Sequence, residues 1–573
     1  MVVSTAPHLR ESYLLWRRFS LPIDSGTRDA YSVPNSVADQ LLSAYTIMVT
    51  SIVMNLWCIL FAIAFFWLLK RDSKPHIVST SLWNKRASLT DSFLELIQPS
   101  AETRKEHWRQ WWIYPAILVV LLCWIAQNVL SIIVPPYINI GHAAPVNPSA
   151  VYAPSNLDSA HAARAEVFSL DVPAALRAVG SAQVASKAIL SKVSISQTTP
   201  ASPSSFPATE MAYNYSISGS DLGLQYYPTL HLTVTGACRT EYKWLMSSEL
   251  DDSLGGGGFT TDTYALFGDN DTYGTMALNI FDGPAPVAYL YTNPDFPPDG
   301  PSGNRTWAAF ISSVDRVSFT AGTDPFYLTT PLSSPDSNDA AGLADTNHVV
   351  LPKRPALSCW QLDEWTYNGA KATITNLTAA NMPGLDLSLG MQLILSRYLS
   401  NPKVVDIGKQ LGLSNLLSST TSLGNIFDAG GSSAFSDLSR LVLAAYIGST
   451  NTLTDLTLYP QSSSSNQSSG TLSNLALDDS GNPRDGVAQF VIYSSEISTL
   501  SIKALIVIPV LALVFWLLAL GLLTWSPLSK VNALDATVLH RTLEEKFPGA
   551  RPQFVRHGRS GSGRGSSWVG ESS

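Results

Sequence analysis

The chain has 573 residues, of which 45% are hydrophobic, and a formal net charge of −8. This composition excludes both a disordered chain and a chain that lies entirely within a membrane. The charge is unevenly divided: residues 138–500 contain 16 Lys+Arg and 31 Asp+Glu, a net charge of −15, and the remainder carries +7. A segment this acidic excludes nucleic acid as a partner of residues 138–500.

The N-terminal arm, residues 1–40, contains no apolar segment of the kind that forms a signal peptide, so we expect the first span to act as the targeting signal. Three uncharged apolar segments follow, each longer than the roughly 20 residues that cross a bilayer core. They predict transmembrane helices at 41–69, 111–137 and 504–525.

Basic residues lie beside the ends of these spans. The linker 70–110 contains eight Lys+Arg, and the tail 526–573 contains seven. By the positive-inside rule both belong in the cytosol, which places the arm and residues 138–500 outside the cell or in a lumen. The four arginines of the arm are an exception to this rule, because the predicted topology places them on the non-cytosolic side.

Within the linker, apolar residues at helical spacing between Ser88 and Pro99 predict a short amphipathic helix. We interpret it as an interfacial helix, with a partner-binding or lipid-sensing helix as the alternative. The tail is rich in Gly, Ser and Arg and is predicted to be disordered. The cores of the spans contain no ionisable residue, which argues against a stand-alone pump. The amides of Asn55, Gln127 and Asn128 suggest hydrogen bonds between the spans.

Residues 138–500 contain segments with helical periodicity and segments in which apolar residues alternate. Together these segments predict one large α+β domain. An Ala-rich helix is expected at 172–191, three further helices at 387–399, 404–416 and 435–447, and a last strand at 486–493. Between them, alternating apolar residues predict an antiparallel sheet or sandwich. Its expected strands are 213–217, 230–234, 277–281, 287–291, 306–311 and 316–319.

Cys238 and Cys359 are the two cysteines of residues 138–500, and in an oxidising compartment such a pair predicts one disulfide. Two buried free thiols are the alternative. The aromatic residues Trp360, Trp365 and Tyr367 follow Cys359 directly. We expect them to pack against the disulfide in the core, with a ligand-stacking surface as the alternative.

Five Asn-x-Ser/Thr sequons all fall within residues 138–500 and predict N-glycosylation. Their number is close to what the Asn, Ser and Thr content supplies by chance, so they agree with the charge argument without proving it. The asparagines are Asn214, Asn270, Asn304, Asn376 and Asn466.

Motifs for catalysis or cofactor binding are absent from the sequence, and the histidines of residues 138–500 are scattered. Residues 269–274 resemble a calcium loop, but Tyr273 occupies a ligand position and Ile280 stands where a bidentate Glu is required. The run Gly255–Gly258 has no lysine and predicts a flexible loop rather than a phosphate site. No catalytic, cofactor-binding or metal-binding residue is therefore predicted.

The segments around the cysteines, Gly-Ala-Cys238-Arg-Thr-Glu-Tyr-Lys-Trp244 and Ser-Cys359-Trp-Gln-Leu-Asp-Glu-Trp365, together with the layout of spans, resemble uncharacterised multi-span membrane glycoproteins of filamentous fungi. The resemblance implies a large external domain with a Cys-aromatic signature and implies no activity. Proteins of this sort sometimes accompany secondary-metabolite gene clusters.

The sequence therefore predicts a non-enzymatic membrane glycoprotein whose external domain binds a ligand, a wall polymer or a partner protein. An accessory membrane subunit for transport or for a membrane-associated biosynthetic pathway is the alternative, and an external hydrolase is a further one. The spans would contact lipid and allow homo- or hetero-oligomers. Spans of this length favour the plasma membrane, with an endomembrane or the vacuole as the alternative.

Overall fold

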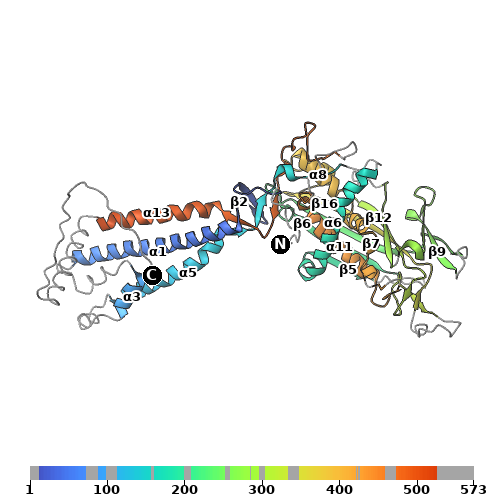
Figure 1. The fold of residues 1–573 in the computed structure, drawn as a ribbon, viewed down its shortest axis with the longest axis horizontal. Helices are drawn as coiled ribbons and strands as arrows, with labels where there is room; N and C mark the ends of the chain where they lie inside the picture. The colour runs from blue at the N-terminus through green and yellow to red at the C-terminus, as the bar shows by residue number, and fades with distance from the viewer. Residues whose placement is uncertain are drawn as a thin grey trace, which may run out of the picture. The chain divides into compact units, whose positions relative to one another are not determined.

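The structure is a computed structural model of the chain. It describes residues 12–71, 88–97, 113–155, 161–198, 208–251, 258–283, 285–295, 304–332, 348–420, 422–423, 426–458 and 473–524. The chain divides into two compact units (Figure 1), one made of residues up to 41 with 137–505, the other of residues 42–136 with those from 506 onward.

The first unit is built on a seven-stranded sheet whose strands all run antiparallel to their neighbours. Its longest pair joins β7 to β16, with Ala356 opposite Glu241 at one end and Thr366 opposite His231 at the other. In order across the sheet the strands are β11 (Val287–Thr292), β12 (Asn304–Ser312), β16 (Ala356–Tyr367), β7 (His231–Glu241), β6 (Glu210–Ser218) and β5 (Val193–Thr198), with β17 (Ala370–Ala372) paired to β16.

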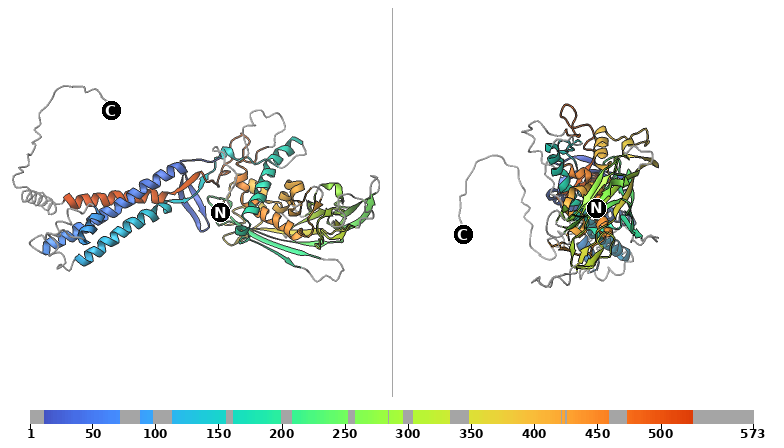
Figure 2. Two further views of the ribbon diagram at one scale, coloured as in Figure 1. Left: turned by 60° about the horizontal axis from the view of Figure 1, so that its bottom comes forward. Right: turned by 90° about the vertical axis from the view of Figure 1, so that its right-hand side faces the viewer.

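One face of this sheet is covered by helices and forms the main core (Figure 2). Alternate residues of β6, namely Met211, Tyr213, Tyr215 and Ile217, are each at most 2% exposed, because successive side chains of a strand point to opposite faces. Burying a large apolar side chain stabilises a fold by about 1.5–3 kcal/mol. The covering helices are α6 (His161–Val184), α8 (Leu389–Leu399), α9 (Lys403–Leu411) and α11 (Ala434–Thr450).

The other face is partly covered by a three-stranded sheet of β10 (Thr275–Leu278), β9 (Phe259–Ala265) and β8 (Leu245–Asp251). Tyr264 of β9 packs on Phe310 of β12 with ring centroids 5.4 Å apart. Over β5, β6 and β7 this face is largely polar and open, and residues such as Ala212, Asn214 and Ser216 are exposed.

A four-stranded sheet, which we call the collar, joins parts of the chain that are far apart in sequence. The N-terminal hairpin β1 (Arg18–Ile23) and β2 (Gly26–Pro34) pairs through β2 with β20 (Ile497–Ser501), which in turn pairs with β3 (Asn139–Gly141). The N-terminal arm therefore belongs to the same folded unit as the large domain.

Short elements complete the first unit. Strands β14 (Thr329–Pro331), β15 (His348–Val350), β13 (Val317–Ser318) and β18 (Ile426–Phe427) form a small sheet, and β19 (Val491–Tyr493) pairs with β4 (Ala143–Pro145). Short helices are α7 (Ser186–Ile189), α10 (Leu417–Thr420) and α12 (Thr452–Asp455).

Within the described residues, three helices are long and apolar enough to cross a membrane: Asn35–Ile63, Ile117–Ile138 and Ile502–Leu522. They belong to α1 (Asn35–Arg71), α5 (Ile113–Ile138) and α13 (Ile502–Thr524). In the second unit, α3 (Leu89–Ile97) packs Leu89 and Leu96 against Val53 and Trp57 of α1 and Val120 of α5. The amides of the spans bond inside their own helices, Asn128 to the carbonyl of Trp124 and Asn55 to Ser51.

The mixed α+β class agrees with the prediction, but several elements differ. The helix expected from residue 172 begins at His161, with Pro173 inside it. The strand expected at 277–281 ends at Leu278, because Asn279 caps a 3₁₀ turn (Ile280–Asp282) by accepting a hydrogen bond from the amide of Phe281. The expected helix 404–416 stops at Leu411. The strand expected at 486–493 is confined to Val491–Tyr493, and Phe490 before it forms an isolated bridge with Leu224.

Candidate functional site

A cavity of about 140 Å³ lies between the helices on the covered face of the main sheet. Five helices contribute to its wall, α6, α8, α9, α11 and α12. Its polar lining residues are Asp171, Arg397, Tyr398, Lys403, Asp406, Gln410, Thr452 and Asp455.

Charged side chains concentrate at this cavity although the domain is poor in basic residues. Asp455 forms an ion pair with Arg177 of α6, whose Nη2 lies 2.8 Å from the carboxylate. No hydrogen bond or ion pair within the described residues engages the side-chain carboxylates of Asp171 and Asp406. Both carboxylates therefore line the cavity without a direct hydrogen bond or ion pair to the described residues.

Burial raises the pKa of Asp171, Asp406 and Asp455 above the ordinary value of an Asp. For Asp171, Lys403 and Arg397 oppose this rise in pKa, whereas Asp406 and Asp455 add to it. The carboxyl groups thus interact electrostatically with one another and with both cations across the cavity. A positively charged or hydrogen-bond-donating ligand would relieve their repulsion.

Tyr398 is 6% exposed, and its hydroxyl has no hydrogen-bond partner within the described residues. The Nε atom of its neighbour Arg397 is likewise buried and unpaired, while the Arg397 guanidinium lies 5.2 Å from the centroid of the Tyr398 ring. Leaving a buried polar group unpaired costs about 1–3 kcal/mol. Such groups at a cavity are typical of a site that a bound molecule completes.

Helix α9 carries Lys403 and Asp406, and its close packing against neighbouring elements fixes their position at the cavity. Pro402 precedes its first residue, Lys403, and Asp406 lies in the first turn. An added Cβ at Gly408 would lie 2.8 Å from Leu290 of β11, and one at Gly448 would lie 2.9 Å from Ile407. The two glycines therefore allow α9 to approach both the sheet and α11 closely.

A second cavity of about 270 Å³ lies between the collar hairpin and the rest of the first unit. Its charged groups are already engaged: Lys192 lies 3.2 Å from Asp221, and Asp24 accepts a hydrogen bond of 2.8 Å from Ser220. This pairing distinguishes it from the first cavity, which is the stronger candidate for binding.

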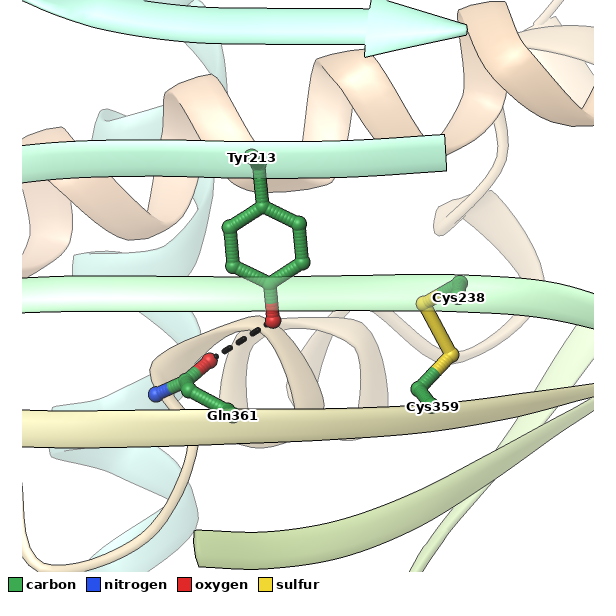
Figure 3. The surroundings of a disulfide bond; sticks show 4 residues. All are labelled: Tyr213, Cys238, Cys359 and Gln361. Carbon is green, nitrogen blue, oxygen red and sulfur yellow. Dashed lines mark hydrogen bonds between the residues drawn. A yellow bond between two sulfur atoms is a disulfide. The ribbon is translucent and has the colours of Figure 1, made fainter. Parts of the chain in front are cut away.

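A disulfide joins Cys238 of β7 to Cys359 of β16, which face each other in the register of the sheet (Figure 3). Near it, the hydroxyl of Tyr213 on β6 reaches across β7 and donates a hydrogen bond of 2.9 Å to Gln361 on β16. Gly236 of β7 stands between these two residues in the register.

The aromatic cluster after Cys359 is divided between the two faces of the sheet. Trp365 is 0% exposed and belongs to the core, as expected. Trp360 is 39% exposed, so the expectation of core packing is wrong for this residue. The strand period explains the difference, since positions 360 and 365 are separated by an odd number of residues.

Three of the predicted glycosylation sites, Asn214, Asn270 and Asn376, are exposed. The side chain of Asn304 and the whole of Asn466 lie outside the described residues. Asn214 stands on the open face of the sheet, where its amide donates a hydrogen bond of 3.0 Å to Thr235.

The calcium-like loop is organised by its own hydrogen bonds. Asp269 accepts from the amides of Asp271 and Thr272 and from the Thr272 hydroxyl, and these bonds lower the pKa of Asp269. No group of three or more metal-ligating side chains occurs in the part of the chain that the structure describes. The glycine run at 255–257 lies outside that part.

Comparison with protein families places residues 172–492 in a family described as a domain of unknown function, DUF8406. The chain belongs to this family. Comparison with curated proteins and comparison with solved structures each give no match.

The DUF8406 segment contains the disulfide and all the lining residues of the first cavity except Leu170 and Asp171. The collar strands β1, β2, β3 and β20 lie outside it. Most of the cavity lining therefore lies within the matched segment, whereas Asp171 and the collar lie outside it.

Sequence reasoning missed the charged residues of the cavity entirely. Asp171, Asp406 and Asp455 lie in three different helices, and none belongs to a local motif. One signal was available. Lys403 and Asp406 stand among the buried apolar residues of α9, where charged side chains are rare unless they are paired.

Proposed function

We propose that this protein is a three-span membrane protein whose large non-cytosolic domain binds a small polar ligand in the cavity between α6, α8 and α9. The observation that carries the proposal is the pair of half-buried carboxylates, Asp171 and Asp406, that line this cavity and make no direct hydrogen bond or ion pair to the described residues. Polar groups withdrawn from water favour direct hydrogen-bond or charged partners, and a polar ligand would supply them here.

The three apolar helices support the membrane part of the proposal. Large side chains of α5 and α13 such as Leu118, Ile132 and Leu517 are 56%, 73% and 52% exposed. An aqueous protein rarely leaves so much contiguous apolar surface uncovered, whereas lipid would cover it.

The collar supports a common side for the arm and the large domain. β2 continues into α1 at Asn35, α5 continues into β3 at Asn139, and β20 continues into α13 at Ile502. The pairing of these strands in one sheet supports the same side of the bilayer for residues 12–34 and residues 139–501. The basic linker and tail then lie in the cytosol, and the plasma membrane is the proposed location.

The disulfide and the exposed sequons support a non-cytosolic glycoprotein, since disulfides persist in oxidising compartments. The topology test uses epitopes at the N-terminus and after residue 300 in sealed, right-side-out vesicles. We expect both to be reached by antibody, an epitope at residue 573 to be protected, and glycosidase to shift the mobility of the protein. Protection of the residue 300 epitope would invert the orientation.

The binding part is tested on the full-length protein in detergent by measuring its unfolding temperature with a panel of polar solutes. We expect at least one solute to raise the unfolding temperature, and Thr452→Trp, which fills the cavity, to abolish that rise. A rise that persists in Thr452→Trp would place the binding site elsewhere.

A hydrolase is a second candidate, and the same carboxyl groups favour it. Two carboxyl groups at one cavity are the residue types that general acid–base catalysis of glycoside hydrolysis uses, one as the acid and one as the carboxylate. Turnover of simple glycosides that is lost in both Asp171→Asn and Asp406→Asn would support a hydrolase over a binding protein.

A further inference from the structure

We infer that the cavity binds a small zwitterion that carries both an ammonium and a carboxylate group, the chemistry of a free α-amino acid. This inference rests on the proposed function and specifies the class of its ligand.

The arrangement of charge around the cavity supplies the first argument. Asp171 and Asp406 present negative charge, and Lys403 and Arg397 present positive charge, yet no ion pair joins these four side chains within the described residues. The third carboxylate, Asp455, is neutralised by Arg177. The four side chains carry two charges of each sign, and a zwitterion would preserve this balance while giving each sign a direct partner, whereas a ligand with one charge would upset it.

The size of the cavity favours a small ligand. Its volume of about 140 Å³ is below the roughly 300–1,000 Å³ of pockets that hold drug-sized molecules. A molecule with few heavy atoms fits within it. The small lining residues Ala174, Ala175 and Gly448 provide this space on the sides formed by α6 and α11.

Two unpaired donors show where the ligand would add hydrogen bonds. The hydroxyl of Tyr398 and the Nε of Arg397 are buried without partners. Lys403 adds a cation to these two donors. Donors and a cation favour a carboxylate, so we assign the ligand carboxylate to Arg397, Tyr398 and Lys403. The ligand ammonium is then assigned to Asp171 and Asp406.

The test measures binding by calorimetry to the full-length protein in detergent at pH 7. Glycine, L-alanine and L-serine are the zwitterions, ethanolamine supplies the amine alone, propionate the carboxylate alone, and glucose an uncharged polyol. We expect at least one zwitterion to bind at least tenfold more tightly than ethanolamine, propionate and glucose.

Variants identify the site. Lys403→Met and Asp406→Asn are each expected to weaken binding of the zwitterion at least tenfold. Lys187→Met, which removes an exposed charge from α7 outside the cavity lining, is the matched control and is expected to bind within twofold of the wild type. Tyr398→Phe keeps the ring and removes only the unpaired hydroxyl, so it tests the site even where a charge variant fails to fold, and we expect it to weaken binding several-fold.

Tighter binding of glucose or of ethanolamine than of every zwitterion, lost in Thr452→Trp, would overturn the assigned ligand class and leave the proposed binding function standing. Absence of binding by the whole panel would overturn the inference. If the binding of a broader set of solutes were also unchanged in Thr452→Trp and Lys403→Met, the proposed function would be overturned as well.

Discussion

Asp437 shows how a single buried carboxyl group links the stability of this domain to pH. It is 1% exposed and accepts hydrogen bonds of 2.5 Å from the Tyr327 hydroxyl and 2.8 Å from the amide of Ser418. Burial raises the pKa of Asp437 to about 6, although these hydrogen bonds act to lower it. Burial likewise raises the pKa of Asp363 on β16 to about 6.

Asp437→Asn is expected to weaken the pH dependence of unfolding. The folded-state pKa lies above the unfolded value, so the folded protein binds more protons between pH 4 and pH 6, and stability falls as pH rises through this window. A shift of about two units corresponds to roughly 2–3 kcal/mol at about 1.4 kcal/mol per unit. Denaturant unfolding from pH 4 to pH 7.5 measures the slope. An equal slope in wild type and variant would contradict the assignment.

Gly236→Ala is expected to destabilise the first unit by about 1–3 kcal/mol, the range for overpacking a core. The added Cβ would lie 2.3 Å from Cζ of Tyr213, whose ring passes over this position to reach Gln361. Gly180→Ala is the control, because an added Cβ there meets nothing within 4 Å on an exposed helix position. It is expected to be neutral or stabilising by up to about 1 kcal/mol. Thermal unfolding of the two variants compares them directly.

At the scale of elements, the pair of β7 and β16 holds the main sheet together both through hydrogen bonds and through a covalent bond. The disulfide joins residues 121 apart in sequence within this pair, three positions from the end formed by Ala356 and Glu241. A cross-link that closes so long a loop restricts the unfolded chain strongly.

The double variant Cys238→Ala, Cys359→Ala is expected to lose about 2–5 kcal/mol of stability while keeping its fold, because the strand register continues on both sides of the disulfide. Replacing Cys58 and Cys123, the free cysteines of the described residues, is the control and removes thiols without a cross-link. Unfolding in denaturant with and without a reductant measures the difference. An equal loss in the control would indicate that thiol packing, not the cross-link, is responsible.

The strands that sequence reasoning found were those with clear alternation. Tyr213, Tyr215 and Ile217 of β6 and Trp307, Ala309 and Ile311 of β12 all point into the core, so their period-two pattern is undisturbed. The first turns of α6 were missed because Pro173 is unfavourable inside a helix. Packing against the surrounding helices stabilises α6 in spite of this proline. The collar and the cavity were missed because their partners are hundreds of residues apart, and pairing over such distances leaves no local pattern.

At the scale of the whole molecule, the N-terminal hairpin is a structural component of the large domain rather than a free arm. Ala30 and Val33 of β2 are 0% exposed, and the Ser32 hydroxyl donates a hydrogen bond of 2.9 Å to the carbonyl of Leu14. The hairpin also provides β20 with its partner along Ala30–Pro34.

Deletion of residues 1–33 is therefore expected to lower the unfolding temperature of the detergent-purified protein by several degrees, because β20 loses one neighbour and its buried residues gain exposure. Deletion of residues 1–11 removes no collar strand and is the matched control. Thermal unfolding followed by near-ultraviolet circular dichroism makes the comparison. Equal unfolding temperatures for the two deletions would show that the hairpin contributes nothing to the domain.

The hydrogen bond from Ser498 to Asn35 spans 463 residues of chain. During synthesis the hairpin emerges first, yet its partner β20 leaves the ribosome only after almost the entire domain has been made. For that interval the edge of β2 that pairs with β20 stays unpaired, so the collar closes as one of the last events of biogenesis. We therefore expect C-terminally truncated chains to be retained by chaperones with the hairpin open, even where the seven-stranded sheet has already formed.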